Sequence, residues 1–446
     1  MFRSIHVPDG EILFERQPQS RAEFADGLED LRRRQREFAA LPVNRRTAEL
    51  LKFADRLQEK SDILAEMVCR EVGRCLRECR AELDKSIGLI RYYAHLAPEL
   101  LAHKTIATQA SLSQVRFEPL GVVLAVMPWN YPVWQVLRFA IPALCAGNAC
   151  LVKPAPSVAR VSKALLDLAD NLPLQAAWLA HDDIEEAVAA CDALAFTGST
   201  ATGRHLAALA GKYLKKSVLE LGGSNAFIVL PDADLVQAAK DACYSRFRDA
   251  GQSCNAAKRI IVADGIADEF IALFLEECAK LKTGDPMSEE TTLAPLHSRR
   301  LRDTLHEQVL DAVANGAEIL CGGVLPEGRG NFYPATVLDK VNSECRVYRE
   351  EVFGPAAVLL RARDAEHALV LANDNPFGLG ASIYTADEAE AWRYAERLQT
   401  GAVFINRHTS SDLRLPFGGV KASGYGRELS EFGLYEFVNV KSYWQK

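Results

Sequence analysis

The sequence predicts an α/β protein built on parallel sheets. Three observations indicate this class: residues 20–103 repeat apolar side chains at helical period, short β-branched runs follow, and helical stretches separate several of those runs. The chain has 446 residues, of which 49% are hydrophobic, and this is enough apolar content for two or three domains with large cores.

The first predicted elements are long helices. Segments 21–41, 44–72 and 78–104 are amphipathic, with apolar residues recurring every three to four positions. Residues 111–121 then alternate in polarity, which is typical of a strand with one buried face.

A strand–helix–strand unit follows at residues 121–128, 133–147 and 148–156. A proline ends its first strand, and both strands are apolar on both faces, as in a buried parallel sheet. Segment 266–282 predicts a further helix. Further strands are predicted at 193–199, 217–223, 225–235, 258–265, 358–362 and 401–406.

Charge and hydropathy exclude several classes of function. A net charge of −7 makes a poor general ligand for nucleic acid or anionic lipid. No apolar run of about 18 residues predicts a membrane span, and the N-terminus lacks the apolar core of a signal peptide. The 11 cysteines, an odd number, predict reduced thiols in the cytoplasm, and no Cys/His cluster has zinc spacing.

A turn after one predicted strand is a candidate phosphate site. Gly198 and Ser199 form this turn, and a helix is predicted to open near Thr202, so backbone N–H groups and the Ser199 hydroxyl can face a phosphate. Arg204 and His205 stand where a Walker A loop needs lysine and serine or threonine, which disfavours a nucleoside triphosphatase. The G-x-G-x-x-G fingerprint of dinucleotide sites is also missing, so the turn alone is weak evidence for a nucleotide.

A second candidate lies in the sequence PWNYP at the end of a predicted strand. Prolines on both sides of Trp129-Asn130-Tyr131 fix the backbone where ligands of open α/β sheets bind. The uncharged side-chain amide of Asn130 suits a developing oxyanion. A plain turn asparagine is the alternative interpretation.

Glu220, in the sequence LELGG, ends an apolar strand before two glycines. Such surroundings predict a raised pKa for its carboxyl group, as a general base near neutrality requires, and the glycines allow close approach of another group. A carboxylate in a structural salt bridge is the alternative.

Cys254, in the sequence GQSCNAAKR, differs from the other ten cysteines in its surroundings. Its segment is polar and carries Arg248, Lys258 and Arg259, which predicts a stabilised thiolate, whereas the others lie mostly in helices or apolar strands. A base, an oxyanion donor and a nucleotide loop in the same chain make Cys254 a candidate nucleophile.

As an ordered set, these motifs resemble the aldehyde dehydrogenase superfamily. The resemblance runs from about residue 20 to the C-terminus and rests on PWNYP, FTGS, LELGG, GQSC, EEVFGP and PFGGVKASGYGRE in family order. The segments WQVLR, GQSCNAAKR and GRELSEFGLYEF are most similar to the short bacterial succinate-semialdehyde dehydrogenases.

The resemblance implies two parallel-sheet α/β domains and a small β arm for oligomerisation. Residues 1–103 and 119–221 would form the dinucleotide-binding domain and residues 222–425 the catalytic domain. Residues 104–118 and 432–446 would form the arm of a homodimer or homotetramer.

It also implies a mechanism. Cys254 would attack the aldehyde carbon, Asn130 and the Cys254 backbone N–H would hold the oxyanion, and Glu220 would activate the water that hydrolyses the thioester. Glu428 matches a family glutamate that relays protons.

The implied cofactor is NAD or NADP. By resemblance, the residues that contact it are Trp129, Lys153, Gly198, Ser199, Glu351 and Phe353. Pro156 stands where many NAD-specific members carry a glutamate that binds the ribose hydroxyls, so a 2′-phosphate meets no like charge there. NADP is therefore compatible with the sequence, and NAD is not excluded.

Arg138 and Arg248 match the arginines that bind the distal carboxylate of succinate semialdehyde in the family. Guanidinium groups bind carboxylates bidentately, although each arginine could instead serve a structural ion pair. Ser411 or Ser410 is a candidate carboxylate donor, and Arg414 a third cation. The predicted substrate is succinate semialdehyde first and glutarate semialdehyde next.

Two other functions stay open at this stage: a catalytically silent nucleotide-binding homologue, and an acylating enzyme with coenzyme A in place of water. The sequence disfavours the first through the intact set of Cys254, Glu220 and Asn130, and the second through Glu220. Ala256 occupies the position of a second cysteine found in some relatives, so no local disulfide switch is expected.

Overall fold

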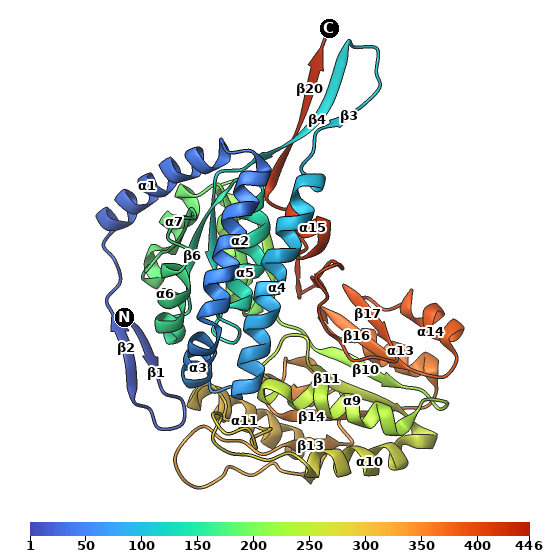
Figure 1. Ribbon diagram of the computed structural model, residues 1–446. Coiled ribbons are helices and arrows are strands. Elements are labelled where there is room, and N and C mark those ends of the chain that lie inside the picture. The colour runs from blue at the N-terminus through green and yellow to red at the C-terminus, as the bar shows by residue number, and fades with distance from the viewer.

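The structure is a computed structural model that describes residues 1–446. An antiparallel hairpin opens the chain, and four helices follow it (Figure 1). The segment predicted as a single helix over 44–72 is two helices, because the backbone leaves helical geometry at Lys60. The elements are β1 (Phe2–Ile5), β2 (Ile12–Arg16), α1 (Arg21–Ala39), α2 (Val43–Glu59), α3 (Ser61–Val72) and α4 (Leu76–Leu100).

The first large sheet has six strands in the order β19-β9-β8-β5-β6-β7. Five strands are parallel, as predicted, and β19 pairs antiparallel with β9. The strands are β5 (Val122–Val126), β6 (Ala149–Lys153), β7 (Leu174–Ala176), β8 (Ala193–Thr197), β9 (Lys216–Glu220) and β19 (Gly424–Tyr425). Its helices are α5 (Trp134–Cys145), α6 (Ala159–Asp167), α7 (Ile184–Ala190) and α8 (Thr200–Lys212).

Strand β19 was not predicted. Its two residues fall inside the range 222–425 that the sequence assigned to the catalytic domain, yet Gly424 pairs with Glu220 at the edge of the first sheet. The chain therefore returns to the first sheet directly beside the candidate base.

The second large sheet has seven strands in the order β12-β13-β14-β11-β10-β16-β17, all parallel except β12. They are β10 (Asn225–Val229), β11 (Ala257–Ala263), β12 (Glu318–Cys321), β13 (Thr336–Asp339), β14 (Ala356–Ala362), β16 (Gly380–Tyr384) and β17 (Ala402–Ile405). The accompanying helices are α9 (Leu235–Phe247), α10 (Ala267–Ala279), α11 (Arg299–Ala314), α12 (Arg346–Arg349), α13 (Ala365–Asn373) and α14 (Glu388–Ala395). The remaining short elements are β15 (Phe377–Gly378), β18 (Val420–Lys421) and α15 (Ser430–Tyr435).

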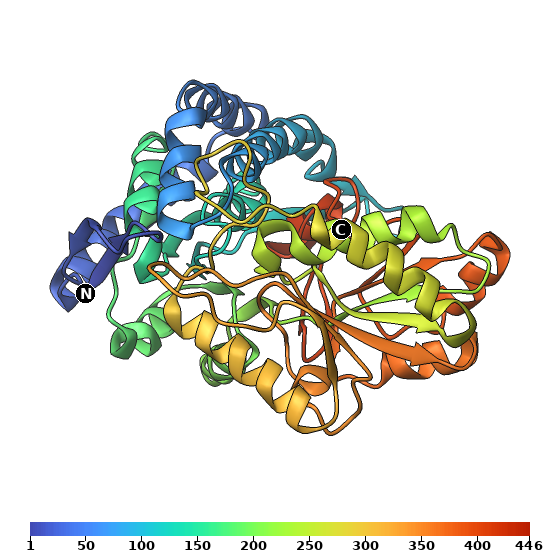
Figure 2. The same ribbon diagram turned by 90° about the horizontal axis from the view of Figure 1, so that it is seen from below.

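Helices cover both faces of the second sheet (Figure 2). Along β10, Phe227 and Val229 pack in the same cluster as α9 and α10, whereas Ala226 and Ile228 pack with α11 and α13. This alternation follows from the two-residue period of a strand, and it explains why both sets of side chains are apolar.

A three-stranded antiparallel sheet projects from the body of the molecule (Figure 1). Its long strand is paired on both sides, with the C-terminal strand on one edge. Val440 and Trp444 on that C-terminal strand are 60% and 61% exposed, which is unusual for such large apolar side chains. The strands are β3 (Lys104–Thr105), β4 (Leu112–Pro119) and β20 (Val438–Gln445).

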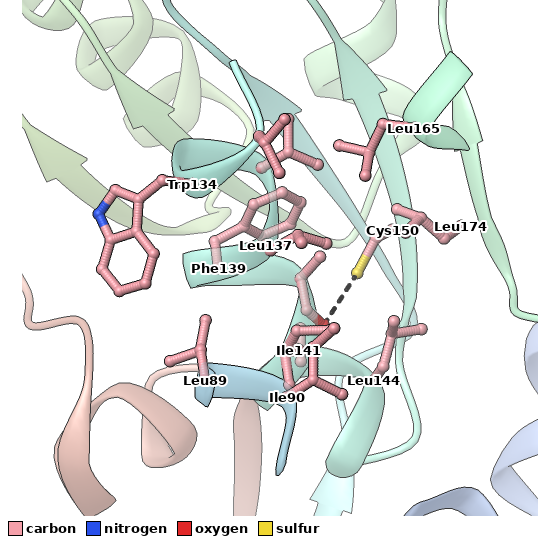
Figure 3. Close-up of a cluster of buried hydrophobic side chains, with 14 of the residues drawn as sticks. Leu89, Ile90, Trp134, Leu137, Phe139, Ile141, Leu144, Cys150, Leu165 and Leu174 are labelled. Atoms are coloured by element: carbon pink, nitrogen blue, oxygen red, sulfur yellow. Dashed lines mark hydrogen bonds between the residues drawn. The ribbon is translucent and has the colours of Figure 1, made fainter. Parts of the chain in front are cut away.

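Helix α5 is central to the largest core, and every one of its residues is buried. Figure 3 shows its side chains between Leu89 and Ile90 of α4 and Cys150 of β6, whose thiol donates to the Ala140 carbonyl oxygen at 3.8 Å. An all-apolar helix suits this position, so the single charged residue of α5, Arg138, needs a partner.

Arg74 joins three distant segments at the boundary between the two large sheets. Its guanidinium group pairs with Glu82 and with Asp249, the latter at 2.5 Å, and lies 4.1 Å from the centre of the Tyr131 ring. The Tyr131 hydroxyl donates to Asp249 at 2.6 Å, and the other Glu82 oxygen accepts from two backbone N–H groups at the start of α5. All of these charges are buried, and each is paired.

Removing this cation is expected to destabilise the fold strongly. Arg74→Met leaves Glu82 and Asp249 buried without a counter-charge, at a cost of roughly 3–5 kcal/mol in the free energy of unfolding. Urea denaturation measures the loss. Arg33→Met is the matched control, because Arg33 pairs with Asp30 and Glu37 on the exposed surface and its removal should leave the midpoint unchanged. Equal midpoints for the two variants would show that the Arg74 network does not hold the fold together.

Candidate active site

A cleft opens where the two large sheets meet. Helices α4 and α5 line it on one side, and η3 (Arg248–Gly251), residues 253–256 and residues 408–411 line the other. Cys254, Arg138, Arg248, Ser410 and Ser411 all face this cleft. The structure thus brings together the candidate thiol and most of the residues predicted to bind the substrate.

Cys254 is partly exposed in the cleft, whereas nine of the other ten cysteines are buried. Burial raises the pKa of its thiol to about 11, although the charges of Arg138 and Lys258 act to lower it. The prediction that its segment stabilises a thiolate is therefore wrong, because desolvation outweighs the nearby positive charge. Arg259 does not contribute, since its guanidinium group donates to the backbone carbonyls of Ser224, Leu371 and Ala372.

Three glycines make room around the candidate base and thiol. A Cβ atom at Gly222 would lie 2.5 Å from a Glu351 oxygen, one at Gly223 2.8 Å from the Cys254 carbonyl oxygen, and one at Gly418 2.8 Å from a Glu220 oxygen. Any other residue would push these groups apart. The two glycines of LELGG thus serve the close approach that the sequence predicted.

Glu220 ends β9 and is 2% exposed, with no hydrogen-bond partner for either carboxyl oxygen. Burial raises the pKa of this carboxyl group well above its ordinary value, and the charge of Glu428 raises it further. The predicted raised pKa is confirmed, and Glu220 forms no salt bridge. A buried carboxyl group without partners is suited to exchanging a proton with a group that enters the site.

Arg138 forms a buried ion pair with Glu428. The guanidinium group also lies 4.8 Å from the centre of the Phe417 ring. Arg138 therefore lines the cleft, but its charge is already balanced by a carboxylate of the chain itself. The structural alternative considered for this arginine describes it at least as well as a role in substrate binding.

Asn130 is buried, and its side-chain amide donates to the Gln252 carbonyl oxygen at 3.0 Å, two residues before the thiol. One hydrogen bond uses one of the two amide protons, so the second proton stays available for an oxyanion. Asp249 and Ala250, just upstream, have φ angles of 54° and 51°, a strained backbone that the Arg74 network holds in place.

Lys258, Glu351 and the two glycines form a second link between the sheets. The Lys258 ammonium pairs with Glu351 and donates to the carbonyl oxygens of Gly223 at 2.6 Å and Cys254 at 3.2 Å. Glu351 in turn accepts from the Gly223 N–H at 3.1 Å. These contacts fix the backbone on which the thiol stands.

Four of the six residues predicted to hold a dinucleotide, Trp129, Lys153, Gly198 and Ser199, lie at or just after the carboxyl ends of strands of the first sheet. Lys153 ends β6 and makes no ion pair, and burial lowers the pKa of its ammonium group. Ser199 caps α8 by accepting from the Thr202 N–H, so the N-terminus of this helix is formed at the predicted turn. A buried cation without a carboxylate, together with a helix N-terminus, fits the phosphate and ribose groups of a dinucleotide.

An aromatic cluster lies beside these residues, and one of its members, His297, was not predicted from the sequence. Trp129 stacks on His297 at 4.2 Å between ring centres and meets Phe353 edge-on at 6.0 Å. Burial lowers the pKa of His297 to about 4, so the ring is neutral, and one of its nitrogens shares a hydrogen bond with Ser157 at 2.8 Å. No motif marked His297, because its partners are far away in sequence.

The remaining cations in or near the cleft differ in their partners. Arg248 is 38% exposed in its side chain and has only a 3.2 Å contact to Asp249, a carboxylate that Arg74 also binds. Arg414 pairs with Asp412 at 2.8 Å and does not line the cleft. Lys85 also lines the cleft, beside Ser411. Its position inside a predicted helix gave no sign of a role in the site.

No group of three or more His, Cys, Asp or Glu side chains is arranged to hold a metal ion, and no helix combines the length and apolarity needed to cross a bilayer.

Comparison with known proteins places this geometry in a family. The aldehyde dehydrogenase family matches residues 2–443. An NAD(P)-dependent succinate semialdehyde dehydrogenase of Escherichia coli is 43% identical over 417 residues, which are 92% of this chain and 90% of that protein. An NADP-dependent succinate-semialdehyde dehydrogenase of Deinococcus radiodurans is 42% identical, over 91% of this chain and 87% of that protein.

The fold agrees with these similarities. The crystal structure of succinic semialdehyde dehydrogenase from Streptococcus pyogenes, in complex with NADP+, matches with a TM-score of 0.97 at 33% identity and covers 100% of this chain and 99% of that one. The chain therefore belongs to the aldehyde dehydrogenase family.

Proposed function

We propose that the protein oxidises aldehydes that carry a distant carboxylate, with succinate semialdehyde as the first substrate and glutarate semialdehyde as the next. One observation carries this proposal: the partly exposed thiol of Cys254 lies in a cleft lined by several cations. The names of the relatives in Escherichia coli and Deinococcus radiodurans support the same substrate. The protein is an NAD(P)-dependent aldehyde dehydrogenase.

The first step forms a bond between the Cys254 sulfur and the aldehyde carbon. Ionised Glu220 takes the thiol proton, and the carbonyl oxygen becomes an oxyanion. The free amide proton of Asn130 and the Cys254 backbone N–H hold this oxyanion. A nicotinamide held by residues such as Trp129, Glu351 and Phe353 would supply the hydride acceptor, and loss of the hydride from the former aldehyde carbon would leave the acyl group as a thioester on Cys254.

The second step hydrolyses the thioester. Glu220 first gives up the proton that it took from the thiol and then takes a proton from water. The resulting hydroxide adds to the acyl carbon, and the carbon–sulfur bond breaks to release the acid and the thiolate. Glu428 raises the pKa of Glu220 by its charge and is buried beside it, so it is placed to relay the proton onward. A carboxyl group of raised pKa favours water over coenzyme A as the acyl acceptor.

Both NAD and NADP fit the candidate cofactor residues. Pro156 brings no carboxylate to the ribose, and Ser157 is oriented by His297 beside it. Lys153 offers an unpaired cation to a ribose hydroxyl or a 2′-phosphate. The other residues proposed to contact the cofactor are Trp129, Gly198, Ser199, Glu351 and Phe353.

The proposal also covers the domain boundaries and the oligomeric assembly. Residues 1–103 and 119–221 bind the dinucleotide, residues 222–425 carry the thiol, and residues 104–118 with 432–446 join subunits into a homodimer or homotetramer. The exposed Val440 and Trp444 of the arm support this assembly. Free thiols throughout the chain support a cytoplasmic location.

Loss of the Cys254 thiol is expected to abolish oxidation. Cys254→Ala removes the only group proposed to bond the aldehyde carbon, so kcat should fall by more than ~10³-fold while cofactor binding, measured by fluorescence titration, stays unchanged. Cys321→Ala is the matched control, because Cys321 is the other partly exposed cysteine. Turnover by Cys254→Ala close to that of the control would refute the mechanism.

The substrate class is tested by two aldehydes of equal length. Because a cation without a partner is costly in the cleft, kcat/KM for succinate semialdehyde should exceed that for butanal by at least ~10²-fold with either NAD or NADP. Steady-state kinetics measure the ratio. Equal values for the two aldehydes would contradict the proposed substrate, and succinyl-CoA formation at a matched rate would favour an acylating enzyme.

Reactivity of the thiol is expected to rise with pH well past neutrality. Burial raises the pKa of Cys254 to about 11, so the thiolate fraction of the cofactor-free protein grows with each pH unit below that value. Alkylation of Cys254 by iodoacetamide, followed by mass spectrometry, should still accelerate at about pH 10. A rate that levels off near neutral pH would show that the charges around the sulfur outweigh its burial.

A further inference from the structure

Lys85 is a half-buried cation that lines the substrate cleft, and the steps proposed above do not use it. It projects from α4, and its ammonium group lies 4.4 Å from the centre of the Trp134 ring. It donates to the carbonyl oxygen of Ser411 at 3.0 Å and to the Ser411 hydroxyl at 2.5 Å. It makes no ion pair, although ammonium groups largely withdrawn from water usually have one.

The charges around the cleft do not balance. Its cationic side chains are Arg74, Lys85, Arg138 and Arg248. The carboxylates that pair with them are Glu82, Asp249 and Glu428. Four cations thus face three carboxylates, and the cation without its own carboxylate is Lys85. A bound ligand with one negative charge completes the set.

We propose that Lys85 and Ser411 together bind the distal carboxylate of the substrate and so determine the preference for acid-tailed aldehydes. This inference rests on the proposed function and deepens it, because it adds a lysine to Arg248, one of the two arginines expected from the sequence. Arg248 contributes a second cation, while Arg138 stays with Glu428.

The chemistry of the pair suits a carboxylate. The Ser411 hydroxyl accepts from Lys85, so its own proton is free to donate to a carboxylate oxygen. The ammonium group has three protons and uses two on Ser411, which leaves one for the second oxygen. Both donors stand in a partly desolvated place, where hydrogen bonds to a charged group are strong.

The ammonium group is also poised to lose its charge. Burial lowers the pKa of Lys85 to about 8, and the charges of Arg138 and Arg248 lower it further, while Asp412 acts in the opposite direction. The only other charged cleft residue on the same helix, Glu82, is engaged by Arg74. Lys85 is therefore charged below about pH 8 and neutral above it, so recognition of a carboxylate by this residue weakens as pH rises.

A purely structural role is the competing explanation, because Lys85 also ties residues 408–411 to α4. The two roles predict different results. Loosening residues 408–411 would slow the oxidation of every aldehyde, whereas loss of a carboxylate partner would slow only the oxidation of aldehydes that carry a carboxylate.

The test compares succinate semialdehyde with butanal in the full-length enzyme. Lys85→Met keeps the length of the side chain and removes its charge, so kcat/KM for succinate semialdehyde should fall by roughly 10²-fold while that for butanal changes little. Lys85→Arg should restore much of the preference. Ser411→Ala keeps the ammonium group, and it should lower kcat/KM about tenfold for succinate semialdehyde and leave that for butanal unchanged. Arg91→Met is the matched control, since Arg91 is an exposed cation on the same helix.

A pH series gives a second readout. The ratio of kcat/KM for the two aldehydes removes the titration of Cys254 and Glu220, which both substrates share. In the wild-type enzyme this ratio should fall as pH rises through about 8, and in Lys85→Met it should be flat.

The outcomes separate the inference from the proposed function. Suppose that the wild-type enzyme prefers succinate semialdehyde and that Lys85→Met lowers kcat/KM equally for both aldehydes, or for neither. Lys85 is then not a determinant of specificity, and the proposed substrate stands. If the wild-type enzyme shows no preference for the acid, the substrate class itself is wrong. Should Lys85→Met not fold, as judged by circular dichroism, Ser411→Ala and Lys85→Arg decide the matter, and an unchanged preference in Ser411→Ala would overturn the pair.

Discussion

The site depends on the buried guanidinium group of Arg74. It lies between Glu82 of α4 and Asp249 of the thiol-bearing segment, and it stacks on Tyr131 of the turn that carries Asn130. Three segments far apart in sequence therefore meet at one cation. Because each member of the network would be costly to bury alone, the network fixes the position of the cleft walls as well as stabilising the fold.

The reactive groups are also largely buried, but unlike the Arg74 network they lack partners of opposite charge. Cys254 and Glu220 are held without the partners that would stabilise their charges, and the pKa of each is raised by burial. Two groups of raised proton affinity can exchange a proton without a large loss of free energy. The neighbouring ion pair of Arg138 and Glu428 shifts these pKa values further. The charge of Glu428 raises the pKa of Glu220, and the charge of Arg138 lowers the pKa of both Glu220 and Cys254. The charged groups around Arg74 are all paired and have a structural role, whereas the ionisable groups near the thiol lack partners and are reactive.

Much of the fold could be predicted from the sequence. The long amphipathic helices, the buried strands and the strand–helix–strand unit each leave a local signal, and the structure contains them. The raised pKa of Glu220 was also predictable, because an apolar strand and two glycines surround it in the sequence itself.

The features that the sequence did not reveal depend on contacts between distant segments. Strand β19 consists of two residues that pair with β9 across the site, and nothing local marks it. His297 contacts Trp129 and Lys85 contacts Ser411, and both partners are far away in the sequence. The thiolate at Cys254 was predicted from nearby positive residues, but Arg259 points to backbone carbonyls and desolvation is stronger. A sequence shows which charges are present, whereas the fold decides which of them are paired.

The most direct test of the account looks for the covalent intermediate itself. At alkaline pH Cys254 can lose its proton without Glu220, whereas attack by water still needs the base. Glu220→Gln should therefore slow hydrolysis more than acylation at alkaline pH, so mixing this variant with succinate semialdehyde and NADP should trap the acyl group. Digestion under mildly acidic conditions and mass spectrometry should then find one succinyl group on the peptide that contains Cys254. Release of succinate without any acyl group on that peptide, or an acyl group on another cysteine, would contradict the account.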